Sequence, residues 1–244
     1  MWYKLKRILI YPDGVTEKQV YPAWWKPNAN TLAYYPLSID TKDYSWNGRD
    51  GTNSNVTFSN GIATFNWSNA MVTVADASWQ RPWNNMTISL WGKANSWTHT
   101  ESWQDLFLLW KFQFYSSWLY NMFYRIIIVN STKNALWWFS SWADYSTYPL
   151  ETTAPISLDT WYLYTITTEW TSKKFYLNWT LINQATSNTT TSTNSVPLTI
   201  WNWWYNNHQA YFNWNISNVI LENKTWTSAE VLNYYNTTKS NYGL

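Results

Sequence analysis

Residues 161–182 read WYLYTITTEWTSKKFYLNWTLI, and this stretch decides the fold class. Aromatic and β-branched residues alternate with period two through residues 161–168, which is the pattern of a half-buried β-strand. The alternation stops at 169–172, resumes through 173–177, stops again at 178–179 and resumes through 180–182. Three short strands joined by tight turns form a meander, so the stretch predicts an antiparallel sheet.

The turns of this meander have unexpected residues. A two-residue hairpin turn favours Asn-Gly because its central residues need positive φ, which only glycine adopts freely. Here Asn178 is followed by Trp179, and the first turn contains Trp170. Both tryptophans are therefore predicted to stand at positions that turn chemistry reserves for glycine.

The same feature recurs along the chain. An average glycine content of ~7% predicts about 17 glycines in a chain of this length, but the sequence has 6 glycines and 23 tryptophans. Four of the six glycines follow Asp or Asn, as at Asn47-Gly48 and Asn60-Gly61. Many tryptophans also follow Asn or Ser in turn-like contexts: Trp46, Trp67, Trp79, Trp179, Trp203 (with Trp204 directly after it) and Trp214.

We hypothesise that most of these tryptophans are glycine in the native protein, because the codon UGA is read as tryptophan in one variant genetic code and as glycine in another. The alternative is a genuinely tryptophan-rich protein whose exposed indoles stack on sugars. A sugar-stacking indole has no reason to follow Asn or Ser at a hairpin tip. Exposed tryptophan is therefore discounted here as evidence of carbohydrate binding.

With glycine at 170 and 179, residues 161–182 closely resemble the central hairpins of laminin-G-like domains, which belong to the concanavalin A-like lectin/glucanase sandwiches. Residues 210–235 resemble the closing strand and short helix of that family, with Trp214 at a family glycine. Residues 43–51, DYSWNGRDG, are similar to an early turn of the family. Three tryptophans stand at family positions that are genuinely aromatic: Trp91, Trp161 and Trp226.

This resemblance implies an all-β fold, an antiparallel two-sheet jelly-roll sandwich of the concanavalin A-like type with one short C-terminal helix. Residues 28–244 are expected to form the laminin-G-like sandwich, and residues 1–27 an N-terminal strand extension and linker. Many domains of this class hold Ca²⁺ through oxygen ligands on their loops. The resemblance implies such a site at Asp43, Asn47 and Asp50, with an Asx turn without metal as the alternative.

Local patterns place the other elements. Apolar and polar residues alternate through 86–93, as in a core strand, and long inner strands are expected over 106–115 and 120–129. Further strands are expected over 32–37, 56–59, 62–66, 71–74 and 135–139. A helix is predicted over 228–238, because Thr227 and Glu230 form the Thr-x-x-Glu capping box. Val231, Leu232, Tyr234 and Tyr235 give that helix an apolar stripe.

Composition limits the class of protein. Hydrophobic residues make up 45% of the chain, which is enough for a core, whereas charged residues make up only 12%. A surface covered by Asn, Thr and Ser is typical of an adhesin or lectin-like domain. The net charge of +2 gives no drive toward nucleic acid. The chain has no cysteine, which excludes disulfides and thiolate metal sites.

The sequence has neither a recognisable signal peptide nor a membrane-inserting stretch. Its first apolar run, residues 8–10, is too short for a signal sequence, and the longest, residues 119–129, is interrupted by Asn121 and Arg125. Export is therefore expected by another route, such as assembly into a virion. Residues 1–25 form a short leader that either docks on virion or cell-surface proteins or simply adds an edge strand.

Catalysis is not expected. The hydrolases of this fold need a strand bearing Glu-x-Asp-x-x-Glu, which aligns carboxylates for glycoside hydrolysis. Glu151, Glu169 and Glu222 are isolated in the sequence, and two scattered histidines support no catalytic triad. Tyr205, Asn207 and His208, in a predicted loop, are the candidate ligand contacts, with a solvated loop histidine as the alternative.

These observations together predict a non-catalytic domain that binds carbohydrate or another surface glycoconjugate through loops at the rim of the sandwich. Weak polar contacts repeated in several copies suit such a domain. The expected setting is extracellular, at a cell surface or on a phage virion. The alternative is a structural decoration domain that has no glycan ligand and uses residues 1–25 for assembly.

Overall fold

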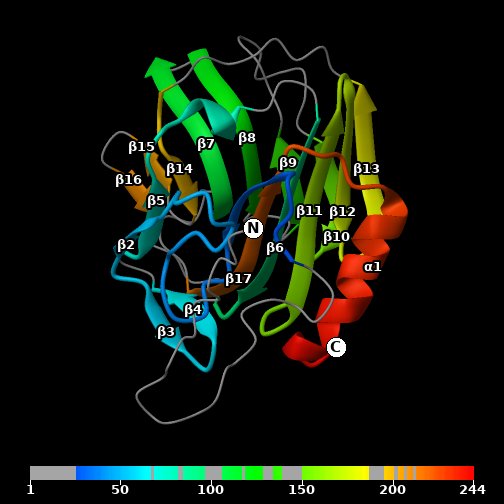
Figure 1. Ribbon diagram of the computed structural model, residues 1–244. Coiled ribbons are helices and arrows are strands. Elements are labelled where there is room, and N and C mark those ends of the chain that lie inside the picture. Colours follow the sequence, from blue (N-terminus) through cyan, green and yellow to red (C-terminus); the bar gives the residue numbers. More distant parts are fainter. Residues whose placement is uncertain are drawn as a thin grey trace, which may run out of the picture.

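The computed structural model describes residues 26–66, 69–81, 85–96, 106–116, 119–128, 134–138, 150–186, 195–200, 203–205, 208–210 and 213–244. Its strands form two antiparallel sheets that face each other, with one helix beside them (Figure 1). This arrangement confirms the predicted β-sandwich with a single short C-terminal helix. The predicted N-terminal strand extension lies outside the described residues, except for its last two, 26 and 27.

The larger sheet has eight strands in the order β13-β12-β11-β6-β17-β4-β3, and β1 also pairs with β17. The predicted meander is confirmed as the consecutive strands at one side of this sheet. The strands are β1 (Thr31–Tyr35), β3 (Thr57–Ser59), β4 (Ile62–Phe65), β6 (Asn85–Ala94), β11 (Trp161–Glu169), β12 (Ser172–Leu177), β13 (Thr180–Thr186) and β17 (Trp214–Glu222).

The smaller sheet has seven strands in the order β10-β9-β8-β7-β14-β5-β2. Three of these strands, β2, β10 and β14, were not predicted from the sequence. The strands are β2 (Thr52–Ser54), β5 (Met71–Val74), β7 (Leu106–Ser116), β8 (Leu119–Ile128), β9 (Asn134–Trp138), β10 (Leu150–Pro155) and β14 (Leu198–Ile200). A separate hairpin consists of β15 (Trp203–Tyr205) and β16 (His208–Ala210).

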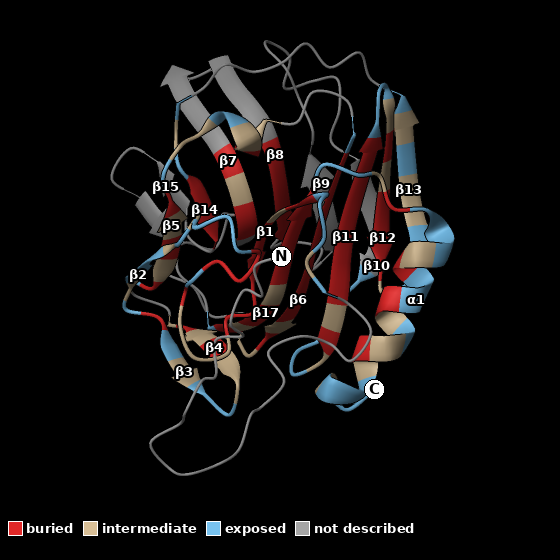
Figure 2. Ribbon diagram, in the orientation of Figure 1, coloured by how far each residue is buried: buried red, intermediate tan, exposed pale blue. Residues whose placement is uncertain are grey.

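The main core lies between the two sheets. Strand β6 shows how the sequence builds it, because Met86, Ile88 and Leu90 point into this core whereas Trp91 points to the opposite face. Both faces of the strand are nevertheless buried (Figure 2). The alternation predicted for 86–93 is therefore confirmed. The face of β6 that carries Trp91 must be covered by another part of the chain.

The helix α1 (Ser228–Thr238) supplies part of that cover. Val231 and Tyr234 of α1 pack with Trp91, Trp226 and Tyr176 in a second apolar cluster on the outer face of the eight-stranded sheet. The 3-10 turn η2 (Lys239–Tyr242) follows, and the ring of Tyr242 stacks on Trp91 with 4.2 Å between ring centroids. The indole of Trp91 also donates to Thr238 Oγ1 at 3.2 Å.

The predicted capping box of α1 is confirmed. Thr227 Oγ1 accepts a hydrogen bond from the backbone N–H of Glu230 at 3.2 Å, and Glu230 Oε2 accepts one from the N–H of Thr227 at 2.8 Å. The predicted apolar stripe is wrong in one position: the side chain of Leu232 is 39% exposed. Within the described residues, no helix has the length and apolar character needed to cross a membrane.

Four of the tryptophans that the structure describes fall into two structural classes, exposed with a left-handed backbone or buried. Trp46 and Trp170 have φ of +66° and +50°, the left-handed region that favours glycine, and their side chains are 59% and 65% exposed. Asn60-Gly61 shows the expected residues in the same setting, with φ of +52° and +77°. Trp46 and Trp170 therefore stand where the backbone asks for glycine.

For two other tryptophans, Trp179 and Trp214, the prediction that they stand at glycine positions of turns is wrong. In the turn between β12 and β13 the left-handed residue is Asn178, with φ of +59°, so the strained position is not that of Trp179. Asn178 fits this conformation well because its Oδ1 accepts from the N–H of Leu163 at 2.9 Å. Trp214 is not in a turn: it is the first residue of β17 and is fully buried in the core.

We predict opposite effects of glycine in these two classes. Trp46→Gly and Trp170→Gly should each stabilise the fold by about 1 kcal/mol, because relief of a left-handed non-glycine residue exceeds the added entropy of the unfolded chain. Trp214→Gly and Trp91→Gly should each cost roughly 3–5 kcal/mol through the cavity left in a packed core. Urea unfolding of the four variants measures these changes. Destabilisation of the same size in all four would contradict the division into two classes.

Candidate functional site

Strand register brings several loops together at one end of the eight-stranded sheet. Thr31 at the start of β1 pairs with Glu222 at the end of β17, and Glu222 pairs with Thr87 near the start of β6. Thr87 pairs in turn with Thr167 near the end of β11, so the β11–β12 turn lies at this same end. We call this end the rim and define it as residues 28–31, 45–49, 169–172 and 222–226.

The first fixed point of the rim is the carboxylate of Asp43, which is buried. Its Oδ1 accepts hydrogen bonds from the N–H groups of Tyr34 at 3.0 Å and Ser45 at 2.8 Å. Its Oδ2 accepts from Ser45 Oγ at 2.8 Å and from the N–H of Arg49 at 3.1 Å. Four donors on one carboxylate hold residues 45–49 against β1, and charge-assisted bonds of this kind are the strong ones.

Asn47 and Asp50 complete this loop. The amide of Asn47 donates to the carbonyls of Thr31 at 2.9 Å and Leu32 at 3.1 Å, and Asp50 Oδ1 accepts from the N–H of Asp43 at 2.9 Å. Asp43 and Asp50 are thus joined directly, and Asn47 is linked to Asp43 through the hydroxyl of Ser45. Among the described residues, no group of three or more acidic, histidine or cysteine side chains is arranged to hold a metal ion. Calcium binding here stays a prediction.

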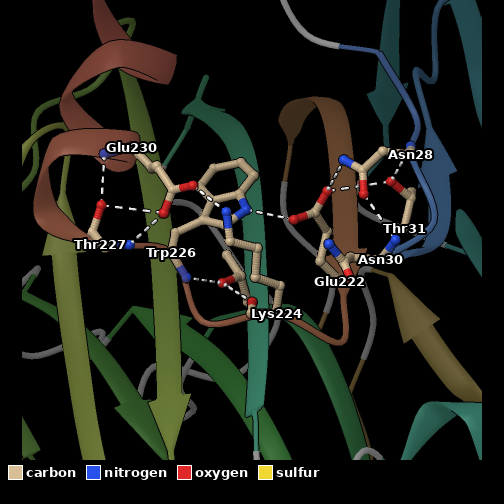
Figure 3. Close-up of polar contacts among 9 residues, drawn as sticks. Asn28, Asn30, Thr31, Glu222, Lys224, Trp226, Thr227 and Glu230 are labelled. Atoms are coloured by element: carbon tan, nitrogen blue, oxygen red, sulfur yellow. Dashed lines mark hydrogen bonds and ion pairs between the residues drawn. The ribbon is translucent and has the colours of Figure 1, made fainter.

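The second fixed point is the side chain of Glu222, which is also buried. Figure 3 shows its polar contacts. Its Oε1 accepts from Asn28 Nδ2 and from Thr31 Oγ1, both at 3.2 Å, and its Oε2 accepts from the indole N–H of Trp226 at 2.6 Å. Burial raises the pKa of this carboxyl, while the hydrogen bonds from Trp226, Thr31 and Asn28 lower it. One side chain therefore ties the start of β1 to the segment that leads into α1.

The segment after Glu222, residues 223–226, is also fixed by hydrogen bonds. Thr87 Oγ1 donates to the carbonyl of Lys224 at 2.7 Å and accepts from the N–H of Trp226 at 2.8 Å. The ammonium of Lys224 forms an ion pair with the carboxylate of Glu230 on α1 (Figure 3). Because Glu230 is also the capping-box residue, the rim and the start of α1 form one hydrogen-bonded unit.

Above these fixed points the rim exposes neutral amides. Asn28, Asn30, Asn47 and Asn223 are all exposed. Asn30 and Asn223 are adjacent, since the N–H of Asn223 donates to the carbonyl of Asn30 at 2.9 Å. Their side-chain amides bind no other side chain or backbone group in the part of the chain that the structure describes. Each amide has two donors and an acceptor available to a ligand.

The ligand contacts predicted from the sequence lie elsewhere. Tyr205 and His208 are in the β15–β16 hairpin, where their backbones pair directly, and Asn207 lies outside the described residues. His208 therefore begins a strand, in contrast to the predicted loop. The hairpin brings Tyr205 and His208 together, and their role as ligand contacts stays a prediction.

A second charged cluster lies away from the rim and is internal. Lys111 is fully buried, and its ammonium donates to Asp76 Oδ1 at 2.6 Å, Gln80 Oε1 at 2.8 Å and the carbonyl of Val196 at 2.5 Å. Burial lowers the pKa of Lys111 to about 8, and Asp76, which also pairs with Arg81, opposes this. All three N–H bonds of the ammonium have acceptors, so the cluster is a satisfied structural element.

The sequence predicted one side of the rim and missed the other. Residues 43–51 are recognisable by their turn pattern, whereas the sequence assigns no role to residues 28–30 and Glu222 stands as an isolated acid. The available signal was weak: Glu222 ends a strand of otherwise apolar and polar alternation, and a charged residue at such a buried position needs partners. Two of those partners, Asn28 and Thr31, are nearly 200 residues away in sequence, so no local pattern reveals them.

No family model matches the chain, and no curated protein matches it in sequence. Solved structures do match its fold. The binding domain of Paraclostridial Mosquitocidal Protein 1 has a TM-score of 0.65 and 16% identity, covering 85% of this chain and 52% of that one. The binding domain of botulinum neurotoxin DC, in complex with SialylT, has a TM-score of 0.62 and 15% identity, with coverages of 87% and 52%.

A sialidase from Trypanosoma rangeli is also similar, with a TM-score of 0.66 and 12% identity, covering 88% of this chain and 34% of the enzyme. The chain thus spans about half the length of the toxin binding domains and about a third of the sialidase. At these identities the likeness concerns the fold: a sheet-rich sandwich of the kind found in lectin-like binding domains. The laminin-G resemblance of the sequence agrees with that fold class.

We predict that Glu222 gives stability a specific pH dependence. Because its pKa in the folded protein lies above the ordinary value of 4.5, its contribution is fully present below about pH 4.5 and is lost as the pH rises through the folded-state pKa. Relative to Glu222→Gln, the wild type should therefore gain unfolding free energy as the pH falls from neutral toward 4.5. Urea unfolding of both proteins at several pH values measures the difference.

The matched control is Glu169→Gln, which removes one carboxylate from an exposed position at the end of β11. Its difference from wild type should change less over the same pH range than that of Glu222→Gln. A pH-independent difference for Glu222→Gln, or one of opposite slope, would show that burial does not dominate the titration of this carboxyl.

Proposed function

We propose that the chain is a non-catalytic binding domain that recognises carbohydrate, or another neutral polar group of a surface glycoconjugate, at the rim. The observation that carries the proposal is the exposed pair of amides, Asn30 and Asn223, on a base fixed by the buried carboxylates of Asp43 and Glu222. The likeness in fold to binding domains, one of them in complex with SialylT, supports the same class of function.

The chemistry of the rim suits sugar hydroxyls. A hydroxyl donates one hydrogen bond and accepts others, and an amide side chain can meet both needs. Rigidity matters because immobilising loops and side chains on binding costs free energy, and a surface already fixed avoids much of that cost. A single such site is weak, so useful affinity requires several copies bound together.

The remaining sequence-based expectations belong to this proposal. A laminin-G-like domain of this kind would work outside the cell, at a cell surface or on a virion, with residues 1–25 as the docking segment. Calcium at Asp43, Asn47 and Asp50 would further stiffen the rim beside the amides. The hairpin that carries Tyr205 and His208 is a second location for ligand contacts. Nucleic acid is not an expected ligand for a chain with a net charge of +2.

We predict that an oligomeric form of the chain binds a subset of glycans on an array, and that Asn30→Ala/Asn223→Ala weakens this binding by about tenfold, the equivalent of one or two lost hydrogen bonds. Asn233→Ala is the matched control, because Asn233 is an exposed asparagine on α1. Its binding should equal that of wild type.

Equal binding by the double variant and the control would place the ligand elsewhere, and the same array with variants at Tyr205 and His208 would then test the hairpin. Failure to bind any glycan at any valency, together with a defined complex formed through residues 1–25, would favour the alternative of a structural decoration domain.

A further inference from the structure

The cations of the rim are already engaged within the protein. The guanidinium of Arg49 donates to the carbonyl of Leu32 and lies over the ring of Trp79, 4.3 Å from its centroid. Burial lowers the pKa of Arg49, and the nearby carboxylate of Asp43 opposes this. Arg49 is therefore turned toward the protein and half-buried, a poor position for contacting a ligand.

Lys224 is the other cation of the rim, and its charge is compensated. Its ammonium pairs with the carboxylate of Glu230, which also forms the capping box of α1. The pairing raises the pKa of Lys224 and lowers that of Glu230, where burial acts in the opposite direction. A ligand carboxylate that approaches this ammonium therefore also meets the carboxylate of Glu230, which repels it.

A sugar that bears a carboxylate needs a cationic partner, and the rim does not offer one. Carboxylates are bound best by arginine in a bidentate arrangement, or by an uncompensated ammonium, because a buried or half-buried anion without a partner is costly. Within the described residues of the rim, the exposed polar groups free to meet a ligand are the neutral amides of Asn30 and Asn223, the hydroxyl of Thr171 and the carboxylate of Glu169, which would repel a sialylated ligand. Lys26, which is exposed, precedes the rim in sequence.

We infer that the site selects neutral glycans and discriminates against their sialylated forms. The inference rests on the proposed function, since it names the ligand class of the same site. It departs from the fold-level neighbours, of which one is a binding domain in complex with SialylT and another is a sialidase. The same fold would thus present an amide surface for hydroxyl groups where a sialylated ligand requires a cation.

The test is an array on which each oligosaccharide is present with and without terminal sialic acid, probed with an oligomeric form of the full chain. For the glycans that bind, the neutral form should bind at least about tenfold more tightly than the sialylated form. Binding should also change little between about 50 and about 500 mM salt, because no ion pair with the ligand is involved.

A charge variant sharpens the test. Glu230→Gln removes the partner of Lys224 yet keeps the capping box, since glutamine serves at that position as glutamate does. This variant should bind sialylated glycans more tightly than wild type does, with a salt dependence that wild type lacks. Lys26→Ala is the control for the exposed lysine outside the rim, and it should leave the discrimination unchanged.

The results of the array distinguish failure of this inference from failure of the proposed function. Tighter binding of sialylated than of neutral forms by wild type, or a marked loss of sialylated binding in Lys26→Ala, overturns the inference while leaving a glycan-binding domain. An absence of binding to either form at every valency contradicts the proposed function itself, and the inference is rejected with it.

Discussion

The buried carboxylate of Glu222 is the interaction on which the arrangement of the rim depends. It binds Asn28 and Thr31 near the start of the first sandwich strand and Trp226 just before the helix, so the two ends of the sandwich sequence meet at one side chain. A charge in this position is tolerated because three donors replace the water it loses. Removing any of those donors leaves a carboxylate that burial already disfavours.

The contacts of Glu222 position the other parts of the rim. The strand β1 is held in register with β17, which places the loop organised by Asp43 beside it. On the other side, the bond to Trp226 and the pair between Lys224 and Glu230 fix the start of α1, and α1 covers the outer face of the eight-stranded sheet. The amides of Asn30 and Asn223 are thus displayed from a rigid base.

Much of the fold could be predicted because its signals are local. The meander at 161–182, the alternation in β6 and the capping box of Thr227 and Glu230 each depend on residues close in sequence. The short strands β2 and β14 escaped because three residues carry no periodicity. The Glu222 cluster could not be predicted for a different reason: two of its three donors, Asn28 and Thr31, come from the opposite end of the chain, and pairing over such a distance leaves no pattern in either segment.

Tryptophan is the residue on which the sequence was hardest to interpret. Trp91, Trp161 and Trp226 are buried on the outer face of the sheet, as expected of genuine aromatic positions, and Trp214 joins them as a core residue despite its turn-like neighbours. Trp46 and Trp170 are exposed, left-handed and located at the rim. If they are glycine, the rim is an amide surface; if they are tryptophan, it is an indole surface suited to stacking on sugar rings.

Peptide mass spectrometry of the protein from its native source decides this most directly. Peptides that contain residues 46 and 170 should show the mass of glycine at these two positions, whereas peptides that contain residues 91, 161, 214 and 226 should show tryptophan. That result would leave neutral amides as the ligand-facing groups of the rim. Tryptophan at 46 and 170 would contradict this account, and the two exposed indoles would then become the principal candidates for contacting a carbohydrate.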